Sequence, residues 1–494
     1  MKTPRLLLAI LAGAGLSVGT FGAANAADSP VSIRLDPQHS GTAVSPDFSG
    51  LSFEVSLLLS NESGLRYFRA DNRPLLNLFH TLGIKNLRIG GNTSDRDVRQ
   101  LPDQSDLDSL FAFAQAAGVK VIYCLRLHNG DPQVDAATAK YIMDHYAPLV
   151  DCFSIGQEPS AYPLEIKDTR PATERMGAAA EKYQYPAYAA DWKRFAAVII
   201  AAVPDVKFSG PGVHNNAVWA QKFMADFGHS NHVALITEHL YPGGAGGKVS
   251  TPEIGRSRML GDDFVHAYQR LYDGFVPAAA SNALPCRLEE VNNYFNGGAT
   301  NVSNTFASAL WGLDFMYWWA AHGTAGLNFH TGDKVAAGNA LRPSKYTAYY
   351  STTNGFEVRP LGYGIKAFDL GGHGILIPAT VTNPDQLNLS AYAVRDQAGN
   401  LSLTLINKED SPGTGRARVS ISVAGDHSAA GQVIFLSAPN QDLAATSGET
   451  LGDAEIQNDG GWNGRWSPLE AAGNGLFSIE LPAATAVIVR LSVK

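Results

Sequence analysis

The sequence predicts an α/β protein in which a (β/α)8 TIM barrel is followed by a smaller antiparallel β-sandwich. Between about residues 48 and 332, short β-rich runs alternate with amphipathic stretches of helical period. Eight such pairs predict parallel strands, and eight is the number that closes a TIM barrel. Beyond about residue 370 the runs are short and alternating, with turn residues between them, which is typical of a sandwich.

The expected barrel strands are apolar and short, and each precedes a helix or a polar loop. They lie at 50–54, 86–90, 120–127, 152–157, 206–210, 233–238, 286–289 and 326–330. The amphipathic stretches predict helices at 74–82, 106–117, 136–145, 188–202, 262–272 and 305–322. Gly or Pro follows several of these helices, as at Gly83 and Pro204, and ends them.

The sandwich is expected to use both ends of the mature chain. Its strands are predicted at 31–35, 389–394, 401–406, 418–423, 432–435, 475–479 and 486–493. We therefore divide the chain into a signal peptide at 1–26, an N-terminal sandwich strand at 27–47, the barrel at 48–368 and the sandwich at 369–494.

The first residues predict a cleavable signal peptide. Lys2 and Arg5 precede an apolar run at 6–19, and small residues at 24–26 form a cleavage site. No cysteine follows that site, so we expect no lipid anchor. The mature chain is expected in a periplasm or outside the cell, without a membrane anchor.

Composition and charge exclude several classes of protein. The net charge of −8 argues against a nucleic-acid partner, because phosphate backbones require clustered Lys and Arg. Phosphate-binding, HExxH and EF-hand motifs do not occur in the sequence, so we expect no metal and no cofactor. Cys124, Cys152 and Cys286 are expected as small buried residues, and a bridge between the first two stays open if their strands are neighbours.

Polar residues gather where the expected barrel strands end, at the rim that carries the chemistry of barrel enzymes. They are Glu54, Asn92, His128, Asn129, Glu158, His239, Tyr241, Glu290 and His330. The aromatic cluster at 311–319 instead has helical spacing, which favours a place in the core.

Two of these residues are carboxylates that we expect to face each other. Strand alternation places Glu158 inward with Ser154 and Gly156. It also groups Glu290 with the apolar Cys286 and Leu288, which favours Glu290 as the inward group.

Alternation places the neighbouring Glu289 on the opposite face, and we expect an outer ion pair between Glu289 and Arg287. Glu238 is a further candidate carboxylate, but His239 and Tyr241 fit the inward positions of that strand better. Two inward glutamates at separate strand ends suit glycoside hydrolysis, and a spacing of about 5–5.5 Å would give retention of configuration. Their roles require one neutral and one ionised carboxyl group.

Five segments at the expected strand ends occur in a familiar order: Gly50-Leu51-Ser52-Phe53-Glu54, Leu87-Arg88-Ile89-Gly90-Gly91-Asn92, Gln157-Glu158-Pro159, His239-Leu240-Tyr241, and Glu290-Val291-Asn292 with Gly297-Gly298. Together they resemble the heparanase and β-glucuronidase group, glycoside hydrolase family 79. The resemblance covers nearly the whole mature chain. It implies a retaining barrel enzyme with a sandwich built from both termini, and no cofactor.

The resemblance also implies roles for individual residues. Glu158 corresponds to the acid/base and Glu290 to the nucleophile, while Tyr241 corresponds to a tyrosine that hydrogen-bonds the nucleophile. The remaining positions imply sugar contacts from Glu54 and Asn92, a place beside the tyrosine for His239, support of the ionised nucleophile by Arg88, and a backbone N–H from Gly297 to a uronic carboxylate.

Three positions depart from the family pattern. Gln157 stands where Asn is usual, and Phe295 and Phe329 stand where tyrosines are expected. Phe has no hydroxyl, so two donors to a uronic carboxylate are missing, and a charge short of donors costs binding energy. Tyr294, Tyr346 and Tyr349 are candidates to replace them.

The sequence therefore predicts an exported, exo-acting β-glucuronidase-like enzyme whose partner is a carbohydrate. Two alternatives stay open: the same chemistry on a neutral or modified sugar (a 4-O-methyl glucuronide, a glucoside or a xyloside), and a non-catalytic carbohydrate-binding protein. The sequence sets neither the linkage nor the oligomeric state.

Overall fold

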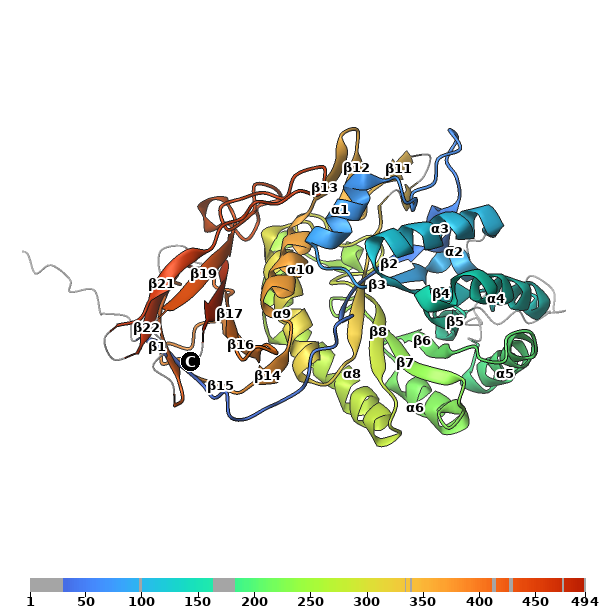
Figure 1. Cartoon of the computed structure of the whole chain (residues 1–494), viewed down its shortest axis with the longest axis horizontal. Coiled ribbons are helices and arrows are strands. Elements are labelled where there is room, and N and C mark those ends of the chain that lie inside the picture. Colours follow the sequence, from blue (N-terminus) through green and yellow to red (C-terminus); the bar gives the residue numbers. More distant parts are fainter. Residues whose placement is uncertain are drawn as a thin grey trace, which may run out of the picture.

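A computed structural model describes residues 30–96, 100–162, 183–333, 335–337, 340–410, 415–425, 430–472 and 475–492. The predicted signal peptide lies outside these residues. Figure 1 shows two units, a barrel and a β-sheet unit, with helices α9 and α10 between them. None of the helices in the described part of the chain has the length and apolar composition that a bilayer crossing needs.

Eight parallel strands close the predicted barrel. They are β2 (Ser49–Glu54), β3 (Asn86–Gly90), β4 (Lys120–Leu125), β5 (Val150–Ile155), β6 (Phe208–His214), β7 (Val233–Leu240), β8 (Cys286–Val291) and β9 (Gly326–His330). All eight overlap the predicted runs, so the fold class is confirmed. Strands β6 to β8 extend further toward the rim than the sequence predicts.

Helices surround the barrel. They are α1 (Arg73–Thr81), α2 (Asn92–Asp95), α3 (Gln104–Ala117), α4 (Pro132–Tyr146), α5 (Tyr185–Ala202), α6 (Ala217–Phe227), α7 (Pro252–Leu260), α8 (Asp262–Ser281), α9 (Phe306–Ala321) and α10 (Pro360–Gly371). Four of these helices are not among the predicted stretches: α2, α6, α7 and α10. Helix α10 contains Gly362 and Gly364, which weaken its sequence signal. These glycines permit close packing, since a Cβ at Gly364 would lie 2.3 Å from the Ala309 carbonyl oxygen of α9.

The second unit holds a four-stranded sheet in the order β15-β1-β18-β22 and a longer sheet in the order β14-β16-β17-β23-β19-β20, with β21 paired to β19. The strands are β1 (Val31–Leu35), β14 (Ile375–Ile377), β15 (Ala379–Thr382), β16 (Leu389–Arg395), β17 (Leu401–Asn407), β18 (Ala417–Val423), β19 (Ala430–Ser437), β20 (Thr450–Leu451), β21 (Ser467–Glu470), β22 (Phe477–Leu481) and β23 (Thr485–Leu491). The N-terminal strand β1 joins this unit, as predicted. Because β1 runs parallel to β18, the smaller sheet is mixed rather than purely antiparallel.

The two units contact each other through α9 and α10. Tyr317 of α9 stacks on Tyr392 of β16 at 4.8 Å between ring centroids, and its hydroxyl lies 2.8 Å from that of Thr404. The Lys408 ammonium lies 2.8 Å from the Asp314 carboxylate across the same contact. The predicted domain limits remain a prediction, and α10 spans the one at residue 369.

The positions of the three cysteines and of Phe329 test two further expectations. The three cysteines are buried and free, as their apolar surroundings predict, and no bridge joins Cys124 to Cys152. Phe329 points outward and packs against Trp311 and Phe315 of α9. The aromatic cluster is thus core, and the predicted pocket position of Phe329 is wrong.

The central position of β1 leads to a stability prediction. Ile33 is buried and alternates with the exposed Arg34 on the same strand. We expect Ile33→Ala to cost about 2–4 kcal/mol of unfolding free energy, because it leaves a cavity in the sandwich core. Arg34→Ala is the matched control and should cost less than about 0.5 kcal/mol. Denaturant titration measures both, and equal effects would contradict the placement of β1.

Candidate active site

The end of β5 brings two side chains to the barrel mouth instead of one. Gly156 and Glu158 have φ values of 95° and 47°, so the regular alternation stops after Ile155. The buried Asp95 stabilises this turn by accepting hydrogen bonds from the backbone N–H of Gln157 and the hydroxyl of Tyr162. Gln157 and Glu158 therefore both reach the site.

At the end of β8, the predicted outer ion pair between Glu289 and Arg287 is not formed. Arg287 is buried and donates to the Asn328 amide oxygen at 2.9 Å and to the Asp47 carbonyl at 2.6 Å. Glu289 is also buried, and it accepts from the Thr237 hydroxyl at 3.0 Å inside the barrel. The pairing of β8 with β9 shifts register between Leu288 and Val291, and this irregularity turns Glu290 to the mouth as well.

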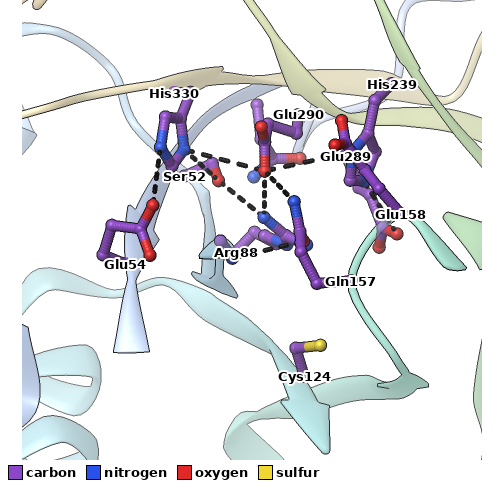
Figure 2. A network of polar contacts seen from close by, with 12 residues as sticks. Ser52, Glu54, Arg88, Cys124, Gln157, Glu158, His239, Glu289, Glu290 and His330 are labelled. Carbon is purple, nitrogen blue, oxygen red and sulfur yellow. Dashed lines mark hydrogen bonds and ion pairs between the residues drawn. The ribbon is translucent and has the colours of Figure 1, made fainter. Parts of the chain in front are cut away.

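Glu290 lies at the centre of a hydrogen-bonded cluster (Figure 2). Its carboxylate accepts from the Arg88 guanidinium at 2.6 Å, the Tyr241 hydroxyl at 2.9 Å and the Gln157 amide at 3.0 Å. Burial raises the pKa of Glu290, but the positive charges of His330, His239 and Arg88 outweigh it and hold the pKa well below its usual range. Glu290 is therefore ionised.

Glu158 lies nearer the cavity opening, with 17% of its side chain exposed against 7% for Glu290. His239 Nδ1 lies 3.2 Å from one carboxylate oxygen of Glu158, and Arg96 donates to the other at 3.1 Å. Burial raises the pKa of Glu158, but the hydrogen bond and charge of His239 lower it below the usual value.

The neighbouring carboxylates raise the pKa of His239. It is fully buried, which lowers its pKa, but the charge of Glu290 and contacts with Glu158 and Glu289 raise the pKa to about 9. The Glu289 carboxylate lies 3.5 Å behind His239, at Nε2. At neutral pH the His239–Glu158 pair thus holds one proton, on the imidazole.

The two carboxylates flank one cavity of about 660 Å³. The carboxylate oxygens of Glu158 and Glu290 and a ring nitrogen of His239 all lie within 4.8 Å of one another. Three such ligand atoms are also what a metal ion requires, but the guanidinium of Arg88 beside Glu290 opposes a cation there.

Most of the predicted site residues meet at this cavity. Those in its wall are Glu54, Asn92, Glu158, Tyr241, Glu290, Phe295, Gly297, His330 and Tyr346. Arg88, Gln157 and His239 lie beneath and contact the two carboxylates. Tyr294 is a wrong prediction: it is fully buried, and its hydroxyl donates to the Gly255 carbonyl, away from the cavity.

The sequence motifs do not predict Arg96, His214, Lys345 or the inward position of Glu289. Arg96, His214 and Lys345 line the cavity and lie at loops or strand ends where no motif marks them. The alternation of the polar Arg287 with Glu289 is a signal for this inward face, because a partly polar barrel interior can hold both side chains. Glu238 is buried away from the cluster and accepts from the Asn216 N–H.

One wall of the cavity suits an anion. Asn296, Gly297 and Gly298 have φ values of 59°, 78° and 86°, so the backbone of this wall is in the left-handed region. Lys345 lies in the same wall. Among the described residues, no group accepts a hydrogen bond from the Gly297 N–H.

Known proteins that resemble this chain in sequence or in fold are glycoside hydrolases. No known family model matches the chain. A β-glucuronidase of Aspergillus niger is 23% identical over 376 residues, covering 67% of each protein. A 4-O-α-L-rhamnosyl-β-D-glucuronidase from Fusarium oxysporum, solved with Rha-GlcA, superposes with a TM-score of 0.69 at 17% identity, covering 92% of this chain and 99% of its own.

A family GH51 arabinofuranosidase from Xanthomonas axonopodis superposes with a TM-score of 0.64 at 15% identity, over 94% of this chain and 100% of its own. At such low identities these solved structures establish the shared barrel-and-sheet fold. Their sugars differ, so the fold leaves the substrate open.

The buried ion pair predicts a double-mutant result. Arg88→Met should cost about 3–5 kcal/mol of unfolding free energy at neutral pH, because it removes the cation in direct contact with the buried Glu290 carboxylate. Adding Glu290→Gln should restore part of that loss, which denaturant titration of the two single variants and the double variant measures. Strictly additive losses would show that the pair is not coupled.

Proposed function

We propose that this protein is a retaining, exo-acting β-glycosidase that cleaves β-glucuronides. The observation that carries the proposal is the pair Glu158 and Glu290, with carboxylate oxygens within 4.8 Å across one cavity. Such a spacing supports direct attack by a carboxylate, since inverting enzymes keep the two groups about 6.5–9.5 Å apart to admit a water molecule.

In the first step, Glu290 attacks the anomeric carbon as the glycosidic bond breaks. The positive charges of His330 and Arg88 keep Glu290 ionised, and a carboxylate nucleophile must be ionised to attack. The departing oxygen takes a proton from Glu158, which receives that proton from His239 Nδ1 across their 3.2 Å contact. The products are a glycosyl-Glu290 ester and the free leaving group.

In the second step, water attacks the anomeric carbon and releases Glu290. Ester formation removes the negative charge of Glu290, which otherwise raises the pKa of Glu158. Glu158 is then a carboxylate and accepts the proton of the attacking water. One residue thus serves as acid and then as base, as retention requires.

The anionic character of the sugar is supported by the wall that contains Gly297 and Lys345. The Gly297 N–H and the Lys345 ammonium suit a uronic carboxylate, and Tyr346 adds a hydroxyl at the same wall. The β-glucuronidase of Aspergillus niger and the rhamnosyl-glucuronidase of Fusarium oxysporum act on the same class of sugar.

A neutral or modified sugar is the second candidate. Phe295 favours it, because this side chain faces the cavity with no hydroxyl and packs against His214 and Tyr241. The presence of both carboxylates argues against a purely carbohydrate-binding role. We also propose that the chain is exported, on the signal-peptide pattern at 1–26.

The nucleophile is tested by substitution. Glu290→Gln should lower kcat/KM on 4-nitrophenyl β-glucuronide by at least about 10³-fold, since the amide cannot form the ester. The exposed Glu62→Gln is the matched control and should leave turnover unchanged. Undiminished turnover in Glu290→Gln would reject the assignment.

The anomeric configuration of the first product tests whether the enzyme retains configuration. Proton NMR recorded during the first turnovers should show the β-anomer before mutarotation. An initial α-anomer would mean that a water molecule, not Glu290, attacks the sugar.

The pH profile tests the proton carried by His239. Because its pKa is raised to about 9, the His239–Glu158 pair keeps its proton below that pH and loses it above. For a glucuronide with a poor leaving group, kcat/KM should fall as pH rises through about 9. A dinitrophenyl glucuronide needs no protonation and should lack this fall; the same fall for both substrates would contradict the role.

A further inference from the structure

Glu289 is a buried carboxylate that takes no part in the proposed mechanism. Its side chain lies on β8, inside the barrel, and is fully buried. The Thr237 hydroxyl donates to one carboxylate oxygen at 3.0 Å, and the Ser209 hydroxyl donates to the other at 3.4 Å. Among the described side chains, only the His239 imidazole forms an ion pair with it, at 3.5 Å. A charge at this depth costs free energy unless it is compensated, so its contact with His239 requires an explanation.

Glu289, His239 and Glu158 form a row on one side of Glu290 (Figure 2). His239 Nε2 lies 3.5 Å from the Glu289 carboxylate, and His239 Nδ1 lies 3.2 Å from the Glu158 carboxylate. The imidazole therefore stands between two acidic groups, one at each nitrogen. When one nitrogen of a histidine keeps its proton beside a carboxylate, the other nitrogen is the one that exchanges a proton with the reacting groups.

Gly212 of β6 leaves room for this row. Its φ is 61°, and a Cβ there would lie 2.6 Å from Glu289 Oε1 and 3.8 Å from His239 Nε2. The Gly212 carbonyl also accepts a hydrogen bond from the Glu158 backbone N–H at 3.1 Å. The same residue thus fits against both ends of the row.

The two carboxylates beside His239 differ in their surroundings. Glu158 is 17% exposed and is paired with Arg96, whose guanidinium donates to it at 3.1 Å. Glu289 is fully buried, where the interaction between two charges is screened less than at a cavity opening. A neutral imidazole therefore keeps its one proton on Nε2, beside Glu289, rather than on Nδ1.

Other charged groups also face the imidazole. Burial lowers the pKa of His239, the charge of Glu290, 3.9 Å from Nδ1, raises it, and the charge of Arg88 lowers it. His214 at the end of β6 and Glu238 of β7 interact with His239 through their charges. Among the described residues, Glu289 is the carboxylate that contacts Nε2.

We propose that Glu289 is a positioning residue that keeps a proton on His239 Nε2 throughout turnover, so that Nδ1 alone exchanges a proton with Glu158. This inference rests on the proposed function. In the first step the Nδ1–H bond breaks and an O–H bond forms on Glu158, which passes that proton to the departing oxygen. In the second step a proton of the attacking water returns through Glu158 to Nδ1, and the Nε2–H bond is unchanged.

Glu289→Gln removes the charge and keeps the size of the side chain. On phenyl β-glucuronide, which has a poor leaving group, the alkaline loss of kcat/KM should move to lower pH by at least about one unit, because His239 loses an anionic neighbour. On a dinitrophenyl glucuronide, which needs no protonation, kcat/KM should stay within about threefold of the wild-type value. Glu238→Gln is the matched control: it removes an equally buried carboxylate outside the row and should move the loss by less than about 0.5 unit.

A second measurement needs no variant and decides the proposal even if Glu289→Gln does not fold. Neutron diffraction from crystals of the wild-type protein above pH 9, where His239 is neutral, should find deuterium on Nε2 of His239 and none on Nδ1.

Four results would overturn this inference and leave the proposed function standing: deuterium on Nδ1 instead of Nε2, an unmoved alkaline loss in Glu289→Gln, an equal move in both variants, or equal losses of kcat/KM on both substrates in Glu289→Gln. Cleavage of neither glucuronide by the wild-type protein would overturn both.

Discussion

The buried ion pair between Arg88 and Glu290 is the constraint on which the rest of the site depends. Arg88 is fully buried, and burial of a lone guanidinium would cost several kcal/mol. Glu290 offsets that cost from the opposite side of the barrel, and Gln157 accepts a hydrogen bond from the same guanidinium at 2.5 Å. The Arg88 guanidinium thus joins residues of three barrel strands or strand ends, and it holds Glu290 ionised and in place.

Local irregularity at the strand ends brings more carboxylates into the site than a regular barrel would. The turn after Ile155 directs both Gln157 and Glu158 into the site, and the register shift between β8 and β9 turns Glu290 to the mouth above Glu289. This stacking places Glu289 behind His239, and His239 in turn contacts Glu158. The raised pKa of His239 is a consequence of these three neighbouring carboxylates.

The fold was largely predictable, because strand and helix periods and turn residues are local signals. Strand-end positions such as Glu54, Glu158 and Glu290 followed from the same pattern. Side-chain direction is less predictable. Glu289 is misplaced because the apolar face of β8, with Cys286 and Leu288, packs outward into the core shared with the helices, and Tyr294 is misplaced because it lies in a loop. Phe329 follows the regular alternation of β9, and only the family resemblance implied a pocket position for it. Arg96 and Lys345 are not predicted because only the tertiary fold brings them to the cavity. Helix α10 is not predicted because Gly364 lowers its helix propensity, although this glycine allows close packing against α9.

The account is tested most directly by trapping the covalent intermediate. A 2-deoxy-2-fluoro-β-glucuronide with an activated leaving group slows both steps, and hydrolysis of the ester is slowed enough for it to accumulate. Mass spectrometry of the digested protein should then find one sugar on the peptide that contains Glu290. A label on Glu158 or Glu289, or burst-free turnover with no labelled peptide, would contradict the assignment of Glu290 as the group that attacks the sugar.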